Sequence, residues 1–92
     1  MGYHTITILD AVQDTEGPAF IVARRKRLLL AVTISGAAVC RIEGRQASGQ
    51  WRTLETFTES GELNMDNFGY HDVRAVAGDM DAARVTVSLS GR

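Results

Sequence analysis

The feature that most constrains the fold of this chain is the alternation of apolar and polar residues in short segments. It is clearest near the end of the sequence, in the run Val85-Thr86-Val87-Ser88-Leu89-Ser90. A period of two places the apolar side chains on one face of a β-strand and the polar side chains on the other. The pattern therefore predicts a strand with one face in a core and one face in water.

Similar segments recur along the chain and are separated by Gly, Asp, Asn and Ser, which favour turns. The predicted strands cover residues 3–9, 19–23, 28–35, 36–43, 51–57, 62–65, 70–77 and 84–90. Seven to nine short strands at this spacing are typical of an all-β fold. We expect a single domain over residues 1–92, built as a two-sheet β-sandwich. Its topology, jelly-roll or immunoglobulin-like, stays open.

The alternation also predicts which side chains form the core. In residues 3–9, Ile6 and Ile8 share one face, with Leu9 on the other. Residues 36–43 direct the side chains of Ala38, Cys40 and Ile42 inward. A turn at residues 78–81 is expected to separate the last two strands.

Two segments depart from simple alternation. Residues 28–34 carry apolar side chains on both faces: Leu28, Leu30, Val32 and Ile34 share one face, and Leu29 and Ala31 lie on the other. Such a strand is either central or in contact with a partner on its outer face. Trp51, Leu54 and Phe57 do not fit a period of two, which indicates a bulge or a twist, and we assign Trp51 and Phe57 to the core.

Composition narrows the classes of function. The net charge is −1, whereas nucleic-acid-binding domains usually carry a basic excess. The longest apolar stretch, residues 28–32, is far too short to cross a membrane. The first residues lack the basic and apolar regions of a signal peptide. We therefore expect a soluble protein made in a cytoplasm, with neither nucleic acid nor membrane as its partner.

No residues are predicted to have a catalytic, cofactor-binding or metal-binding role. Cys40 is the only cysteine, and its spacing from His4 and His71 matches no metal-ligand motif. The aspartates late in the chain are expected to form turns, and His71 is expected to pair with Asp72 at a strand end. A G-x-S-x-G nucleophile motif is absent from the sequence.

The candidate functional residues are therefore surface residues. The basic run 24–27 is expected to lie in a loop or at a sheet edge, or to pair with an acidic protein surface. Phe68 and Tyr70 lie in a Gly-containing loop, where aromatic side chains favour protein contacts over sugar stacking. The predicted interface residues are Phe20, Arg24, Arg25, Arg27, Leu29, Phe68 and Tyr70.

Several motifs carry a resemblance to a known family. They are Gly36–Gly44, Gly49-Gln50-Trp51-Arg52-Thr53-Leu54, Thr56-Phe57-Thr58, Gly61, Asp72-Val73-Arg74-Ala75 and Val85–Leu89. Over residues 28–90 this layout resembles small β-sandwich structural proteins of tailed bacteriophages and prophages, of the decoration or cement type.

The resemblance implies a non-enzymatic virion protein without a cofactor, assembled in the cytoplasm of the bacterial host. Its expected role is to decorate the capsid, to oligomerise (as a trimer by preference) and to stabilise the phage head by bridging capsid subunits. Its expected partner is the major capsid protein or another virion protein. The alternative is a carbohydrate-binding or host-attachment module of a phage tail or fibre, using Phe68, Tyr70 and the aspartate-rich loops.

Overall fold

Two long, bent strands organise the fold. The computed structural model describes residues 4–22, 27–66 and 69–91. The long strands are β4 (Arg27–Arg45) and β7 (Asp72–Gly91), with 19 and 20 residues. The shorter strands are β1 (His4–Ala11), β2 (Thr15–Glu16), β3 (Phe20–Ile21), β5 (Arg52–Phe57) and β6 (Gly61–Asp66).

The seven strands of the described residues belong to one antiparallel sheet. Its main order is β1-β7-β4-β5, while β2 and β3 also pair with β7 and β6 also pairs with β4. The last strand of the chain therefore lies between the first strand and β4. The sheet is therefore complete only when β7, near the carboxyl terminus, pairs with both β1 and β4.

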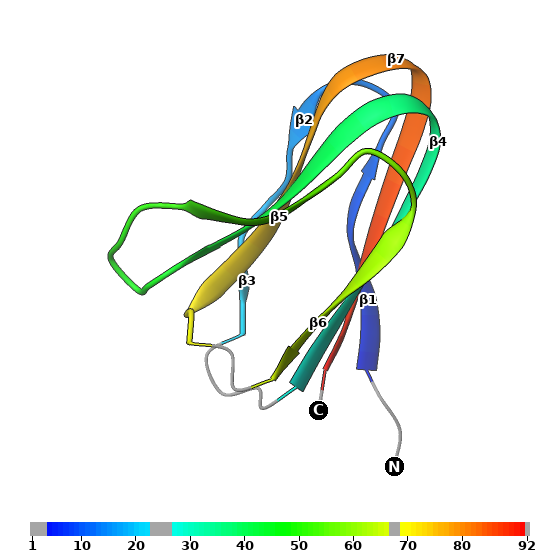
Figure 1. Cartoon of the computed structure of the whole chain (residues 1–92). Helices are drawn as coiled ribbons and strands as arrows, with labels where there is room; N and C mark the ends of the chain where they lie inside the picture. The colour runs from blue at the N-terminus through cyan, green and yellow to red at the C-terminus, as the bar shows by residue number, and fades with distance from the viewer. Residues whose placement is uncertain (1–3, 23–26, 67–68, 92) are drawn as a thin grey trace.

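The sheet folds over on itself, because β4 and β7 arch through a common bend (Figure 1). One half, here called leaf 1, contains β1, β6, residues 27–35 of β4 and residues 84–91 of β7. The other half, leaf 2, contains β2, β3, β5, residues 39–45 of β4 and residues 72–78 of β7. The shortest dimension of the molecule is 17 Å, which accommodates two stacked leaves.

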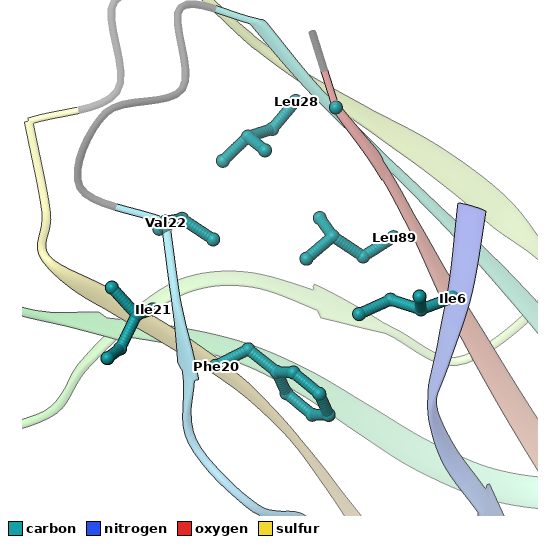
Figure 2. Close-up of a pocket in the computed structure, with 7 residues that line it drawn as sticks. Ile6, Phe20, Ile21, Val22, Leu28 and Leu89 are labelled. Carbon is teal, nitrogen blue, oxygen red and sulfur yellow. The ribbon is translucent and has the colours of Figure 1, made fainter. Parts of the chain in front are cut away.

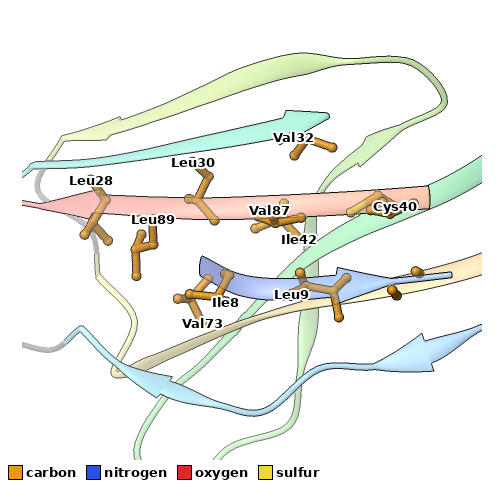
Figure 3. Close-up of a cluster of buried hydrophobic side chains, with 14 of the residues drawn as sticks. Ile8, Leu9, Leu28, Leu30, Val32, Cys40, Ile42, Val73, Val87 and Leu89 are labelled. Atoms are coloured by element: carbon orange, nitrogen blue, oxygen red, sulfur yellow. The ribbon is translucent and has the colours of Figure 1, made fainter. Parts of the chain in front are cut away.

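The core lies between the two leaves and is aliphatic (Figure 3). Leu30, Val85 and Val87 are fully buried in leaf 1, and Ile42 and Val73 are fully buried in leaf 2. These side chains come from alternate positions of β4 and β7, so the period of two selects the core in both leaves. The predicted inward positions Ala38, Cys40 and Ile42 are confirmed.

The bend is built by two bulges in β7. Ser35 pairs with Arg84, Ala37 with Asp81 and Val39 with Gly78, so two steps along β4 twice correspond to three along β7. One extra residue would turn every following side chain of β7 to the opposite face. Two extra residues restore the alternation, and the same face of β7 remains in the core on both sides of the bend.

Backbone conformation explains which residues stand at the bend. Gly36 has a φ of +80°, and a Cβ at this position would lie 2.3 Å from the carbonyl oxygen of Ala82. Glycine is required here both by its conformation and by the close approach of β7. Asp79 and Ala82 also have positive φ, at 51° and 47°, which is uncommon for residues with a side chain.

Polar side chains bond backbone groups near the bend. The Asp14 carboxylate accepts a hydrogen bond from the backbone N–H of Met80, at 3.0 Å. The Ser60 hydroxyl accepts one from the N–H of Ile34, at 2.9 Å. These bonds tie the connection between β1 and β2 and the connection between β5 and β6 to the two long strands.

The all-β prediction is confirmed, and the seven strands found in residues 4–22, 27–66 and 69–91 lie within the predicted range. Two separate packed sheets are not confirmed, because hydrogen bonds join all the strands into one folded sheet. Two of the strands are also long rather than short. Residues 28–35 and 36–43 form a single strand, because Gly36 lets the chain bend without breaking its pairing with β7.

Three local predictions are wrong. Residues 78–81 do not separate two strands, since they belong to the bulged bend of β7. Leu9 is 5% exposed instead of facing outward, because a register shift between Thr7 and Leu9 turns it into the core. In the segment 19–23, strand pairing is limited to Phe20 and Ile21 among the residues described.

The bulge predicted in residues 51–57 is confirmed. Ile42 pairs with Glu55 and Glu43 with Thr53, which leaves Leu54 as the extra residue of β5. Leu54 and Phe57 pack against the core as partly buried residues. The assignment of Trp51 to the core is wrong, because its ring lies against arginine side chains of leaf 2.

Candidate functional site

The outer face of leaf 2 carries a network of ion pairs centred on Arg74. The Arg74 Nε donates to Glu43 Oε1 at 2.7 Å, and its Nη1 lies 2.9 Å from Glu16 Oε1. Arg41 Nε lies 3.5 Å from the second oxygen of Glu43. Glu43 is 7% exposed, so its charge depends on these arginines for compensation.

Trp51 joins this network to a second ion pair. Its ring lies 4.3 Å from the guanidinium carbon of Arg74 and 4.5 Å from that of Arg45, measured to the ring centroid. Both distances are within the range of cation–π contacts. The register places Glu43 opposite Arg74 and Arg45 opposite Asp72, so the ring spans two neighbouring ion pairs of the sheet.

The Asp72 carboxylate, at the start of β7, interacts with two side chains, those of Arg45 and His71. Arg45 Nε donates to one carboxylate oxygen at 2.8 Å, and His71 Nδ1 lies 2.7 Å from the other. The hydrogen bond from Arg45 lowers the pKa of Asp72 below its ordinary value against the opposing effect of burial, and the His71 bond adds to this effect. The predicted pairing of His71 with Asp72 is confirmed.

The outer face of leaf 1 has a different chemistry. The strand register places small and hydroxyl side chains next to one another across β1, β7 and β4. Ser90 of β7 lies between Thr5 and Leu29, and Ser88 lies between Thr7 and Ala31. The hydroxyl oxygens of Thr5 and Ser90 are 2.9 Å apart. This surface, here called the hydroxyl face, carries few charges in its centre, with Glu62 on the adjacent edge strand β6.

An apolar pocket of about 100 Å³ opens at the end of the leaves away from the bend (Figure 2). Phe20 and Val22 point into it from one side, and Leu89 and Ile6 line the other. Ile6 and Ile21 are 46% and 74% exposed. The core is therefore partly open at this end.

The Cys40 thiol and the possible metal ligands are the remaining residues that the sequence raised for a chemical role. Cys40 is fully buried, and its burial raises the pKa of the thiol to about 11. Among the described residues, no group of three or more His, Cys, Asp or Glu side chains is placed to hold a metal ion. Within the same residues, no helix has the length and apolar character required to span a membrane.

The four predicted interface residues that the structure describes do not form one surface. Phe20 lines the apolar pocket, whereas Arg27 and Leu29 alternate with the buried Leu28 and lie on the outer side of leaf 1. Tyr70 is half-buried near the start of β7, beside leaf 2. Three further predicted residues, Arg24, Arg25 and Phe68, lie outside the described residues.

Sequence reasoning missed the cluster that surrounds Trp51. The alternation Arg41-x-Glu43-x-Arg45 was a usable signal, because it places three charged side chains on one face of a strand. It gave no information on the partner strand. Arg74 and Asp72 lie about thirty residues further along and meet this face only through the pairing of β4 with β7.

Comparison with solved structures finds a similar fold in a prophage-derived protein. The SPBc2 prophage-derived protein YomS aligns with a TM-score of 0.78 and 12% sequence identity, over 99% of this chain and 94% of that chain. This likeness establishes a shared fold over nearly the full length. PirA aligns with a TM-score of 0.45 and 10% identity, over 98% of this chain and 93% of that chain, which is too slight to support an argument. No protein-family model and no curated protein matches the chain.

Proposed function

We propose that this chain is a non-enzymatic structural protein of a tailed phage or prophage, and specifically a decoration protein of the virion head. The observation that carries the proposal is the fold shared with YomS, a prophage-derived protein, over 99% of this chain. The motifs in residues 28–90 that resemble small phage structural proteins point to the same class.

The surfaces are compatible with assembly. The hydroxyl face presents Leu29 and Ala31 among small side chains, and its centre has few charges that a second copy would have to desolvate. We therefore assign self-association of the protein, with a trimer as the expected state, to this face. Multiple symmetric copies would bridge capsid subunits with avidity, without a need for tight single contacts.

The experiment that tests self-association is the solution mass of the protein, with a charge placed on the hydroxyl face. Leu29→Glu should lower the mass to that of a monomer. The matched control is Val12→Glu, because Val12 is 70% exposed and lies outside this face, in the connection between β1 and β2. The control should keep the oligomer.

Binding to particles tests the virion role. We expect the protein to co-sediment with expanded capsids of the phage that encodes it and to bind immature capsids less. A monomeric protein with no affinity for capsids, tails or complete virions would contradict the proposal. Binding to tails alone would contradict the head assignment while retaining the virion class.

A further inference from the structure

An open, polar recess lies beside leaf 2, between the β4–β5 connection and the start of β7. Its volume is about 540 Å³, which is in the range of pockets that bind small molecules. It is separate from the apolar pocket at the ends of the leaves, and the two share no lining residue. The lining residues are Gln46, Gly49, Gln50, Trp51, Arg52 and Tyr70.

The walls of the recess are held in place by contacts outside it. The Trp51 ring packs on the guanidinium groups of Arg45 and Arg74, which are themselves held by carboxylates. The Gln46 side-chain amide donates to the carbonyl of Gly69 at 2.7 Å, which connects the loop to the residue before Tyr70. Walls that are already ordered reduce the entropy that a ligand loses on binding.

Tyr70 is also positioned by packing. A Cβ at Gly44 would lie 3.0 Å from Cγ of the Tyr70 ring, so the ring rests directly on the backbone of β4. The two aromatic residues of the recess therefore stand on rigid parts of leaf 2.

The chemistry of the lining selects a class of ligand. The described lining residues include two aromatic rings, two primary amides and one guanidinium, but no aliphatic side chain and no carboxylate. An apolar ligand would cover the Gln50 amide and the Arg52 guanidinium without offering them hydrogen bonds, and a cation would find no counter-charge. Arg45 and Arg74 are neutralised by Asp72, Glu43 and Glu16, so a polyanion would meet Arg52 as the main cation of the lining.

We infer that this recess binds a neutral saccharide of one or two sugar rings. Sugar rings present C–H groups that pack on aromatic faces, and hydroxyl groups that both donate and accept hydrogen bonds. The Trp51 and Tyr70 rings match the first property, and the amides of Gln46 and Gln50 match the second. The inference does not depend on the proposed virion role, since it is based on the geometry of the recess alone.

The test uses Trp51, the single tryptophan of the chain, as a local reporter. The intact protein is first screened on an array of neutral oligosaccharides, and the saccharides that bind are then titrated while Trp51 fluorescence is followed. We expect a saturable change in fluorescence. Tyr70→Ala and Gln50→Ala should each weaken the association constant about tenfold, which corresponds to one good contact.

The controls separate binding from folding. Gln13→Ala removes the same side chain at an exposed position between β1 and β2 and should bind like the unchanged protein. Because Tyr70 packs against Gly44, Gln50→Ala is the variant that tests the site if Tyr70→Ala alters the melting temperature.

Three results would overturn the inference. They are the absence of saturable binding to any saccharide on the array, undiminished binding in both variants, and saturation by mononucleotides or inorganic phosphate in place of neutral sugars. None of these results bears on capsid binding, so failure here and failure of the proposed virion role can be told apart.

Discussion

The two leaves share the same two long strands and the same aliphatic interior, yet their outer faces differ. Leaf 1 presents the hydroxyl face, with Leu29 and Ala31 among serine and threonine. Leaf 2 presents ion pairs around Arg74 and a tryptophan that covers them. Inward positions are fixed by the need for a core, whereas outward positions are free to specialise. We propose that leaf 1 serves association and that leaf 2 supports a rigid recess.

The largest effect is expected where the two leaves join. Gly36→Val should destabilise the fold by about 3 kcal/mol or more, because valine would have to adopt a positive φ and its Cβ would clash with the Ala82 carbonyl. The measurement is the free energy of unfolding in urea. Gly78→Ala is the control: a Cβ there meets nothing within 4 Å, so the loss should stay below about 1 kcal/mol. Equal losses in the two variants would show that the positive φ and close packing of Gly36 are not the constraint.

A smaller effect is expected on the outer face of leaf 2. Arg74→Met should cost about 2 kcal/mol, because it leaves the buried Glu43 carboxylate without its closest partner. Adding Glu43→Gln in the same chain should restore part of that loss, since the uncompensated charge is removed. The free energies of the two single variants and the double variant form the test. Strict additivity would contradict the coupling.

The same comparison predicts different effects for the two outer faces. Arg84→Met removes the exposed Arg84–Asp10 pair of leaf 1, with the two side chains 62% and 45% exposed. Solvent and salt screen such a pair, so we expect no measurable change in stability. A loss as large as that of Arg74→Met would show that burial does not distinguish the two faces.

The next effect depends on pH and concerns Asp72. Its folded pKa lies below the ordinary carboxyl value of 3.8, mainly because of the hydrogen bond from Arg45. Its contribution to stability is therefore present above that value and is lost as the pH falls through the folded pKa. Asp72→Asn should be less stable than the unchanged protein at about pH 7, and the difference should shrink towards about pH 2. A difference that is constant with pH would contradict this account.

The last prediction concerns the reactivity of the Cys40 thiol, which tests the shared interior. With a pKa of about 11, roughly one thiol in a thousand is ionised at about pH 8, and the side chain is fully buried. A thiol reagent should therefore modify Cys40 only at the rate at which the protein unfolds. Rapid modification of the folded protein would show that the leaves separate more readily than the structure indicates.

Much of the fold could be predicted because alternation reports directly on burial. The inward positions of β4, those of residues 85–89 in β7 and an irregularity within residues 51–57 follow from it. The orientation of Leu9 and the continuity of β7 could not be predicted, because both depend on register shifts against a partner strand. A local pattern contains no information on which strand will be the partner.

The candidate sites show the same division. Aromatic residues near a turn drew attention to Tyr70, which does line the recess, but Trp51 looked like a core residue beside Leu54 and Phe57. Its true neighbours are the arginines of β4 and β7, and Arg74 is distant in sequence.

By itself, the sequence determined that this chain forms strands and which side chains most of those strands bury. Both follow from the order of neighbouring residues, because alternation has a period of two and exposed apolar surface is costly. Only the tertiary structure decided that the strands form one folded sheet, that two bulges keep both halves of β7 in register, and that Trp51 lies on charged residues. These features arise from pairing between residues 27–45 and 72–91, which are brought together only when the whole sheet closes.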